Sequence, residues 1–527
     1  MSDCRPDSLT AISGPSRAAL PRAGVSFAEL FACAQPLAAA HHSVLTDGTV
    51  ALSYAELAHR IVALAEDIAW RGVAPGQVVA LEAPNTVAGA LVLLALLSRG
   101  LSVVLLPPDR TAARPPLPRF CRHSLVVRGQ LADAARIDLD RVDSFLQISE
   151  HAEFAEPPAG AAIGTDKLLL RTSGSIGTPK LVMFGHRRLL ANAVNVIGRL
   201  QLRPDDRIAI PVPLTHMFGL GAGFLPGLAS GASIDLVEAA NLLRYAEHER
   251  RFRPTVAFLT PALCFMIARQ RGAPDHYRHV VVAGDKLTPE TFELAERRFG
   301  RVVNLYGCTE LGAITAADPS AEHDRRSTTS GTALPGVALR IDPRDESDQP
   351  DQPGQPDQID DGAPDAGGVM CRHPFGFDGY VTADGEPSTD PQRVRDGWYR
   401  SGDLGRVHPG GLLEVLGRAD HSVNRHGRLV MLGDVERAMA GLPGVERVVT
   451  VLGSDGLRGR DIIAFCVPRE GHTLDRDAIR DACARVLPAY AIPDHVRIIA
   501  GVPMLPNGKV DRGALSALTP ASHTSAP

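Results

Sequence analysis

The chain has 527 residues, a net charge of −5, and 44% hydrophobic and 22% charged residues. This length exceeds what a single hydrophobic core serves, so we expect two or more domains. The small net charge gives no reason to expect nucleic acid or an anionic membrane as a partner. Eight scattered cysteines without a CxxC pair argue against a zinc site or a disulfide framework and favour a cytoplasmic protein. We expect no membrane span, because no apolar run reaches about 18 residues and no signal-peptide core is present.

The first elements in chain order predict a strand–helix–strand unit. Apolar residues at helical spacing predict a helix over 53–72, which ends at a glycine. The run 77–85 predicts a strand, 87–100 a buried helix and 101–109 a second strand. Units of this kind build parallel sheets, so the pattern favours an α/β fold.

The stretch RTSGSIGTPKLV, from Arg171 to Val182, follows the apolar run 168–170, which predicts a short strand. Small residues let backbone N–H groups approach an anion, hydroxyls donate further hydrogen bonds, and a lysine supplies charge. The residues concerned are Thr172, Ser173, Gly174, Ser175, Gly177, Thr178 and Lys180. No GK[ST] sequence closes the stretch, so it is not a Walker motif. Taken alone, it is compatible with a phosphate-binding loop and with a flexible turn between two strands.

The alternation of strands and helices continues past this loop. Strand-like runs cover 207–214, 232–237, 254–261, 279–287 and 301–310. Parallel sheets place ligands at the loops that follow their strands. We therefore expect Thr260, Gly284, Asp285 and the stretch 306–310 to face one crevice together with the phosphate loop.

Composition sets several segments apart. Residues 1–24 are predicted to be a disordered leader and 519–527 a disordered tail. Residues 343–366 are acidic and rich in Pro and Gln, which predicts a solvated loop insertion. A β-rich segment follows to about Leu416, and a small α+β domain is expected from Asp420 onward.

Four further motifs carry chemistry. NLYGCTE, at a strand end, offers an aromatic ring for a base, a glycine, a hydroxyl and a carboxylate for Mg²⁺. In WYRSGDLGRV, Asp403 follows a tight turn and can accept ribose hydroxyls, and GRADHSVNRHGRLV places Arg418 just before the expected domain boundary. PNGKVDR holds Lys509 on a turn. Each motif alone is also compatible with a strand end, an ordinary turn or a solvated basic patch.

In this order and spacing the motifs resemble the AMP-forming adenylate-forming superfamily, which includes acyl-CoA synthetases, carrier-loading adenylation enzymes and firefly-type luciferases. The resemblance runs from about Ser53 to Leu515. It implies an α/β fold, with a large N-terminal AMP-binding domain over 25–419 and a small mobile α+β C-terminal domain over 420–518. The large domain is expected to hold mixed sheets flanked by helices and a β-rich subdomain.

The resemblance also implies a two-step reaction. A carboxylate attacks the α-phosphate of ATP, giving acyl-AMP and pyrophosphate. A thiol then attacks the acyl carbon, usually the phosphopantetheine of CoA or of a carrier protein. ATP and Mg²⁺ are the implied cofactors, and a small carboxylic acid is the implied substrate.

For the nucleotide, the resemblance implies one role for each motif. The loop 172–180 resembles the one that closes over the β- and γ-phosphates. Tyr306 matches the residue that lies against adenine, with Gly284 and Asp285 beside the ring and Gly307 next in the motif.

The catalytic roles are carried over in the same way. Thr309 matches the α-phosphate contact and Glu310 the Mg²⁺ ligand, while Asp403 matches the ribose-binding aspartate and Arg418 an arginine near the ribose and phosphates. Lys509 matches the lysine that bridges the carboxylate and α-phosphate oxygens. A cation between two reacting anions offsets their repulsion and stabilises the transition state.

A hinge and three departures complete the comparison with the family pattern. Asp420 lies where the family has the hinge about which the small domain rotates. Ile176 stands where the loop usually carries a second hydroxyl, which predicts a looser grip on pyrophosphate. Leu181 follows the loop lysine where glycine is common, and Asn424 stands where a lysine is common past the hinge.

The predicted acyl pocket is apolar with a few polar groups. Its residues are His216, Phe218, Phe258, Thr260, Ala283, Asn304 and Gly312. Relatives that activate α-amino acids carry an aspartate where this chain aligns Phe218, and an unpaired ammonium in an apolar pocket is costly. We therefore expect an aryl, cinnamyl-type or medium acyl carboxylate. His216 matches an aromatic position beside this pocket in many CoA ligases, with a buried core histidine as the alternative.

The acceptor stays open between two thiols and other nucleophiles. The ending LPNGKVDRGAL resembles that of peptide-synthetase adenylation domains, which slightly favours a stand-alone carrier protein over CoA. A nitrogen nucleophile is a further alternative. The competing class is a non-catalytic nucleotide-binding relative, against which Lys509, Glu310 and Asp403 argue.

Overall fold

The computed structural model describes most of the chain as two compact units. The first unit comprises the described residues up to 337 together with those from 373 to 388, and the second comprises 338–372 and the described residues from 394 onward. In the part of the chain that is described, every helix is too short or too polar to cross a bilayer. The described residues are 26–108, 116–129, 137–156, 163–171, 180–238, 241–272, 274–342, 366–388, 394–425, 428–456, 459–504 and 510–518.

Several predictions fall on residues outside these ranges. They concern the leader 1–24, the tail 519–527, nearly all of the insertion 343–366, the phosphate loop from Thr172 to Thr178, and Lys509. The division into units follows packing, so the predicted domain boundary at 420 stays a prediction about which part of the chain rotates.

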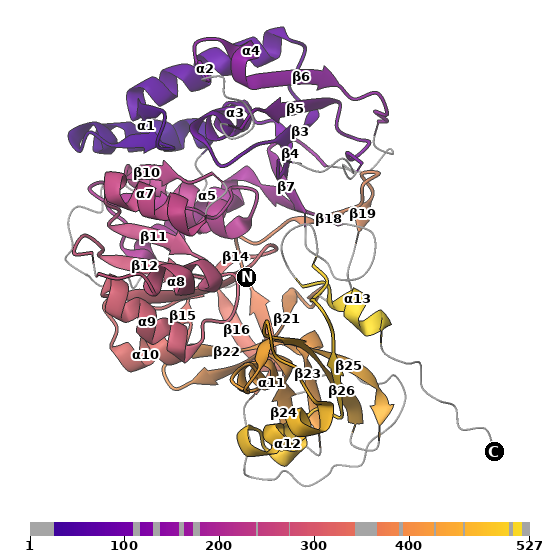
Figure 1. Ribbon diagram of the computed structural model, residues 1–527. Coiled ribbons are helices and arrows are strands. Elements are labelled where there is room, and N and C mark those ends of the chain that lie inside the picture. The colour runs from indigo at the N-terminus through magenta and orange to yellow at the C-terminus, as the bar shows by residue number, and fades with distance from the viewer. Residues whose placement is uncertain are drawn as a thin grey trace, which may run out of the picture. The chain divides into compact units, whose positions relative to one another are not determined.

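One sheet of the first unit contains the predicted strand–helix–strand. Its strand order is β19-β18-β8-β7-β4-β3-β5-β6, with β3, β4, β5 and β7 parallel to their neighbours in this group. Figure 1 shows the sheet beside α2 and α3. The bounds are β3 Val78–Glu82, β4 Ser102–Leu106, β5 His123–Val127, β6 Leu146–Glu150, β7 Lys167–Arg171, β8 Leu181–Gly185, β18 Gly379–Val381, β19 Pro387–Ser388, α1 Phe27–Ala40, α2 Tyr54–Trp70, α3 Val87–Ser98 and α4 Val142–Phe145.

The sequence explains the two helices beside this sheet. Ser53 caps α2 and forms a capping box with Glu56, and the apolar residues of α2 face one side. Helix α3 is apolar on all sides and is buried from Val87 to Leu97, as a helix in the middle of a core must be. The predicted helix over 53–72 and the parallel strands on either side of α3 are confirmed.

A second sheet of the first unit carries the later strands in the order β15-β14-β13-β12-β11-β9-β10-β1-β2. Strands β10, β9, β11, β12 and β13 are parallel neighbours, whereas β14 returns antiparallel to β13. The strands are β1 Val44–Thr46, β2 Ala51–Ser53, β9 Arg207–Ile210, β10 Ser233–Leu236, β11 Val256–Leu259, β12 His279–Val282, β13 Val302–Cys308, β14 Gly312–Ala316 and β15 Thr332–Ala333. The helices are α5 His186–Leu200, the π-helix η2 Phe218–Phe224, α6 Leu225–Ser230, α7 Leu242–Phe252, α8 Pro261–Ala268, α9 Pro289–Phe299 and α10 His323–Thr328.

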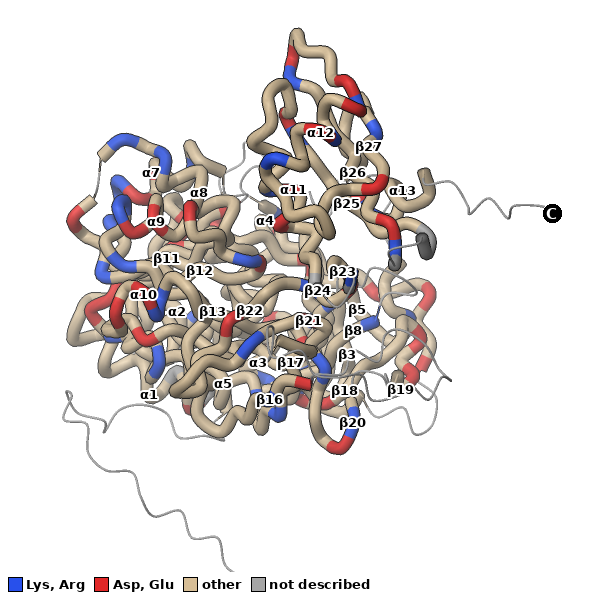
Figure 2. The backbone as a smooth tube through the Cα atoms, turned by 90° about the horizontal axis from the view of Figure 1, so that it is seen from below, with Lys and Arg blue, Asp and Glu red and all other residues tan. Residues whose placement is uncertain are grey.

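Both faces of this sheet are covered. Val256 and Phe258 of β11 join the core cluster that includes α5 and α6, whereas Ala257 and Leu259 join the cluster that includes α8 and α9. Charged residues of both signs occur along α7 and α9 (Figure 2). The strand expected over 207–214 is shorter than predicted and ends at Ile210, because the two prolines that follow cannot donate ladder hydrogen bonds.

The second unit is β-rich at its start and α+β towards its end. An antiparallel sheet in the order β16-β17-β21-β22 is followed by a hairpin, β23-β24, and by the sheet β25-β26-β27. Helices α11 and α12 cover one face of this last sheet and α13 the other. The bounds are β16 Ala338–Asp342, β17 Gly367–Arg372, β20 Val394–Arg395, β21 Trp398–His408, β22 Leu412–Arg418, the 3-10 helix η3 Ala419–His421, β23 Ser422–Arg425, β24 Arg428–Met431, α11 Leu432–Ala440, β25 Val445–Gly456, β26 Gly459–Pro468, α12 Arg476–Val486, the 3-10 helix η4 Ala489–Ala491, β27 His495–Ile498 and α13 Arg512–Ala517.

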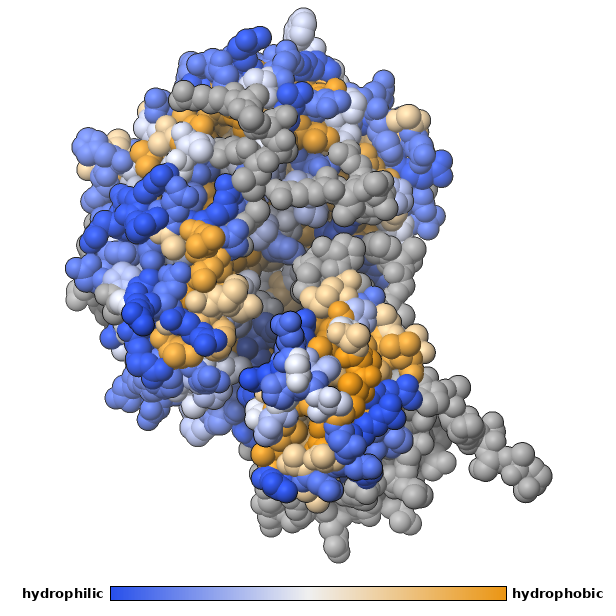
Figure 3. Space-filling model, in the orientation of Figure 1, coloured by the Kyte–Doolittle hydropathy of each residue, from blue (hydrophilic) through white to orange (hydrophobic). Residues whose placement is uncertain are grey.

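Exposed hydrophobic side chains lie beside α13 in the second unit, although the sheet residues under this helix, Val449, Val451, Ile463 and Phe465, are at most 3% exposed. Figure 3 shows hydrophobic side chains gathered there. Leu518, directly after α13, is 55% exposed, and Met504, which bridges to Val510, is 46% exposed. Both residues lie outside the strands β25, β26 and β27, so the exposed hydrophobic side chains border the sheet and do not belong to it.

Candidate active site

Three neighbouring parallel strands bring the predicted residues to one edge of the sheet. Thr260 follows β11 and caps α8 by accepting the N–H of Leu263. After β12 come the buried Ala283 and then Gly284, whose φ of +96° favours glycine. Since parallel strands end at the same edge, these residues lie at the same end of the sheet as the motif on β13.

The hairpin of β13 and β14 carries the motif NLYGCTE. Tyr306 is 9% exposed and Glu310 is 7% exposed, so both side chains are held by the fold. A Cβ at Gly307 would lie 2.2 Å from the carbonyl oxygen of Gly312, which no side chain can tolerate. Gly312 has φ +69°, and a Cβ there would lie 2.9 Å from Asn192 Nδ2. Gly307 is therefore required by the close approach of the two strands, and Gly312 by its left-handed backbone and its contact with Asn192 of α5.

The carboxylate of Glu310 is held by a residue that the sequence did not indicate. Tyr380 Oη donates a hydrogen bond of 2.9 Å to Glu310 Oε1, across 70 positions of sequence. The N–H of Phe377 donates to the carbonyl oxygen of Glu310 at 2.8 Å. Lys180 Nζ lies 5.7 Å from the centroid of the Tyr380 ring. A tyrosine near a strand after a long insertion gives no spacing signal for such a contact.

The turn after Glu310 is clamped by two further side chains that sequence reasoning missed. Asn192, which is 3% exposed in α5, donates from Nδ2 to the carbonyl oxygen of Leu311 at 3.1 Å. His373 Nε2 lies 3.0 Å from the carbonyl oxygen of Ala313 and 3.1 Å from Asn192 Nδ2. Burial lowers the pKa of His373, although its hydrogen bond to Ala313 acts in the opposite direction. These contacts fix the backbone on which Glu310 is mounted.

The predicted acyl pocket includes the start of the π-helix η2. The rings of Phe218 and Phe258 meet edge to face with centroids 5.9 Å apart, and Phe258 is fully buried. Gly219 is required here, because a Cβ would lie 2.5 Å from the carbonyl oxygen of Pro213. His216 is exposed, which excludes the alternative of a buried core histidine. π-Helical turns occur frequently at functional sites.

In the second unit, Asp403 and Arg418 form part of one ion-pair network. Arg418 Nη1 lies 3.4 Å from Asp403 Oδ1 and donates to the carbonyl oxygen of Ser401 at 3.2 Å. Its Nε donates to Asp420 Oδ1 at 3.2 Å. Gly402 has φ +79° but lies within β21, so the tight turn predicted before Asp403 is wrong and a strand carries this residue. The arginine therefore links the predicted ribose carboxylate to the predicted hinge residue.

The donor set around Glu310 suits Mg²⁺. Glu310 supplies a carboxylate and Thr309, next to it, a hydroxyl. Among the described residues there is no group of three or more His, Cys, Asp or Glu side chains that could hold a metal. Mg²⁺ is usually bound by one or two carboxylates together with substrate phosphates. A single carboxylate is therefore sufficient for a site where a nucleotide supplies the remaining ligands.

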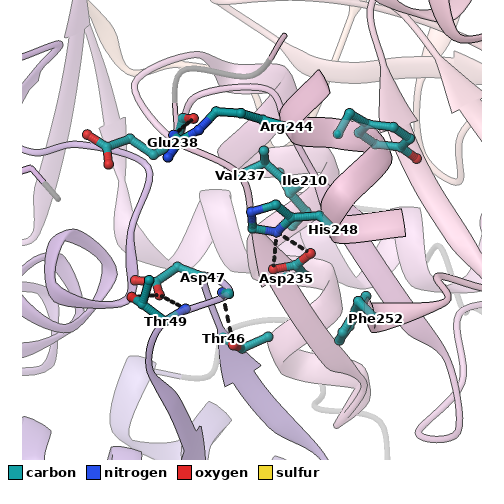
Figure 4. Close-up of polar contacts among 12 residues, drawn as sticks. Thr46, Asp47, Thr49, Ile210, Asp235, Val237, Glu238, Arg244, His248 and Phe252 are labelled. Atoms are coloured by element: carbon teal, nitrogen blue, oxygen red, sulfur yellow. Dashed lines mark hydrogen bonds and ion pairs between the residues drawn. The ribbon is translucent and has the colours of Figure 1, made fainter. Parts of the chain in front are cut away.

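A separate polar cluster in the first unit is structural (Figure 4). Asp47 Oδ1 accepts from the N–H and hydroxyl of Thr49, while Oδ2 accepts from the N–H of Val87 at the start of α3. His248 Nδ1 lies 2.8 Å from Asp235 Oδ2, and burial is the main cause that raises the pKa of Asp235. All of these groups join secondary-structure elements, and none is a predicted site residue.

The first unit has a sheet covered by helices on both faces, and the β13–β14 hairpin of that sheet carries Glu310. Together with the small α+β part of the second unit, this is the architecture of an AMP-forming ligase. The chain belongs to the AMP-binding enzyme family, whose model matches residues 34–381, and the model of the AMP-binding enzyme C-terminal domain matches 434–509. It is thereby a member of the adenylate-forming superfamily and an ATP-using carboxylate ligase. The predicted superfamily, fold class and enzyme class are confirmed.

Relatives and solved structures agree with this assignment. The chain is 29% identical to an indoleacetate–CoA ligase of Aromatoleum aromaticum over 75% of this chain and 76% of the relative. It is 28% identical to a feruloyl-CoA synthase of an Amycolatopsis species over 90% and 95%. The anthranilate CoA ligase AuaEII, solved with anthranoyl-AMP, has the same fold, with a TM-score of 0.73 at 19% identity over 95% of this chain and 98% of that one.

Proposed function

We propose that this enzyme activates an aryl, cinnamyl-type or medium acyl carboxylate as acyl-AMP, with release of pyrophosphate, and passes the acyl group to a phosphopantetheine thiol. The observation that carries the proposal is that η2, which begins at Phe218, packs against β14 of the hairpin that carries Glu310, and that the ring of Phe218 meets that of Phe258. A carboxylate and ATP must meet where an apolar acyl site adjoins a phosphate and metal site.

The residues of this edge divide the work of binding. Tyr306 packs against adenine, Thr309 contacts the α-phosphate, and Glu310 orients the triphosphate. Bound Mg²⁺ would neutralise phosphate charge there and favour departure of pyrophosphate. For the second unit, taken separately, the proposed role of Asp403 is to accept the ribose hydroxyls, with Arg418 beside it.

Lys509 and the phosphate loop complete the proposed machinery. Lys509 donates to the attacking carboxylate and to an α-phosphate oxygen, so that two anions approach across a cation. The loop 172–180 holds the β- and γ-phosphates by backbone N–H groups and hydroxyls. Rotation at Asp420 then replaces Lys509 by the entering thiol.

Phe218 supports an acid without an α-ammonium. Its ring packs edge-on against Phe258, so this side of the pocket offers no carboxylate partner for a cation. The partly exposed Thr260 and Asn304 offer polar groups for a ring hydroxyl or amine. The named activities of the indoleacetate and ferulate relatives, both aromatic acids, favour the aryl class.

The acceptor is proposed as a thiol, with CoA and a stand-alone carrier protein as the two candidates. Relatives that match along most of their length carry CoA in their names, which favours CoA. The C-terminal motif LPNGKVDRGAL favours a carrier.

Carboxylate-dependent ATP–pyrophosphate exchange tests the proposal. The panel pairs each aryl or cinnamyl acid with its α-amino counterpart, for example 3-phenylpropanoate with phenylalanine. We expect the acid without the ammonium to react faster by about 100-fold, because burying an unpaired charged group costs several kcal/mol. A preference for the amino acid would contradict the pocket assignment. If none of the acids supported exchange, the result would favour a non-catalytic relative. CoA and a phosphopantetheinylated carrier are then compared as acceptors, with amines as the third arm.

A further inference from the structure

Two charged side chains from separate parts of the first unit, Glu310 and Lys180, contact the phenol of Tyr380. Tyr380 lies on β18, Glu310 in the turn after β13, and Lys180 directly before β8. The phenol oxygen is 2.9 Å from Glu310 Oε1, and the Lys180 ammonium lies 5.7 Å from the centroid of the same ring. The anion thus meets the edge of the tyrosine and the cation its face, which matches the charge distribution of an aromatic ring.

The tyrosine is held rigidly in this position. It is 5% exposed, and its backbone pairs with Val182 of β8. Its ring meets that of Phe377 edge to face at 4.9 Å, and the N–H of Phe377 in turn donates to the carbonyl oxygen of Glu310. The hydroxyl is therefore aimed by a sheet and a packed neighbour, and its direction does not depend on a flexible loop.

We propose that Tyr380 is a positioning residue that sets the orientation of the Glu310 carboxylate for Mg²⁺. The face of the same ring also holds the Lys180 ammonium. The inference rests on the proposed role of Glu310. A hydrogen bond to one carboxylate oxygen restricts rotation about the side-chain bonds, so the carboxylate meets the metal already oriented. Lys180, whose ammonium the ring face holds, ends the predicted phosphate loop in the sequence.

The Tyr380→Phe variant removes only the hydroxyl and keeps the ring. Tyr54→Phe is the matched control, because Tyr54 is equally buried and donates to the carbonyl oxygen of Ala232 at 2.7 Å. The measurement is the rise in melting temperature caused by saturating ATP, titrated with MgCl₂ in the absence of any acid. We expect Tyr380→Phe to raise the Mg²⁺ concentration at half-effect by about 10-fold or more, as for other residues that orient metal ligands. Tyr54→Phe is expected to leave that concentration unchanged.

A double-mutant cycle separates positioning from general loosening. Glu310→Gln keeps an acceptor for the phenol and removes the charge, and we expect Tyr380→Phe to add nothing to its Mg²⁺ midpoint. Additive effects, or a Tyr380→Phe midpoint within about twofold of the wild-type value, would overturn the inference. The readout needs no substrate acid. Mg²⁺-dependent ATP binding without any carboxylate-dependent exchange would therefore contradict the proposed function but not the role of Tyr380. Absence of any Mg²⁺ effect in the wild-type protein would overturn both.

Discussion

Asp403 and Arg418 lie directly opposite each other on β21 and β22, and Arg418 Nη1 approaches Asp403 Oδ1 at 3.4 Å. The guanidinium is held there by its further bonds to the carbonyl oxygen of Ser401 and to Asp420. The Asp403 side chain is only 14% exposed, so its charge is compensated by a fixed neighbour and its rotamer is restricted. Such a carboxylate is prepared to accept two hydroxyls without reorganisation.

Replacement of Asp403 by Ala is expected to raise the KM for ATP by about 10- to 100-fold, because hydrogen bonds to a charged group contribute about 1.5–3 kcal/mol. The KM for the acid should change little. Glu414→Gln is the control, since Glu414 pairs with Arg406 across the same two strands without touching the predicted site. Initial rates of exchange give the two constants, with ATP varied at saturating acid for one and the acid varied at saturating ATP for the other. An equal rise in the control would assign the effect to the hairpin.

Lys509→Ala is expected to lower carboxylate-dependent exchange by about 100- to 1,000-fold, the usual loss for one donor that stabilises transition-state charge. Transfer from synthetic acyl-AMP to a thiol should stay within about tenfold of wild type, because the second step uses a different charge arrangement. Thioester formation from acid plus ATP and from acyl-AMP would be compared in the same preparation. Loss of both activities would contradict the assignment of Lys509 to the first step.

The burial of His279 leads us to expect that the first unit loses stability in acid. This residue is fully buried at the start of β12, neither ring nitrogen has a hydrogen-bond partner among the described residues, and burial lowers its pKa to about 3. Because the folded-state pKa lies below the unfolded value, the stabilisation is present above pH 6.5 and is lost as the pH falls towards 3. The unfolding free energy should fall by about 1.4 kcal/mol per pH unit in this window.

The variant His279→Leu tests this dependence. Between pH 7 and pH 5 the wild-type protein should lose about 2 kcal/mol more stability than the variant. Urea titrations at the two pH values give the comparison. Parallel pH profiles for the two proteins would show that His279 does not control acid unfolding.

Asp47→Asn is expected to destabilise the first unit by about 2–3 kcal/mol without changing Mg²⁺ dependence. Asp47 accepts at both oxygens and caps the N-terminus of α3 through Val87, so an amide nitrogen in either place would face a donor. Asp140→Asn is the surface control, because its side chain is 77% exposed. A neutral Asp47→Asn variant in thermal unfolding would contradict the structural role assigned to this cluster.

Local patterns were sufficient to predict the strand ends but not the contacts that orient them. Asp285 and Glu310 were predicted as site residues because each lies in the polar cluster that follows an apolar strand. This pattern is contained within about ten residues. Tyr380 and Asn192 reach Glu310 and Leu311 only through long-range packing, and nothing in their local sequence marks them.

Backbone conformation was predicted less well than burial. Pro211 and Pro213 cut the expected strand short, and the glycine-rich stretch after Met217 forms a π-helix. Hydrophobicity gives the buried face of such a stretch, whereas hydrogen-bond register depends on close contacts such as Gly219 against Pro213.

The contact between Gly307 and the carbonyl of Gly312 limits how this enzyme can be re-engineered. A Cβ placed 2.2 Å from a backbone oxygen excludes every other amino acid at position 307 unless the hairpin itself moves. Saturation libraries aimed at new acids therefore waste their diversity on this glycine. Productive variation is to be sought at Phe218, Thr260 and Asn304, where partly exposed side chains, and not the main chain, form the boundary.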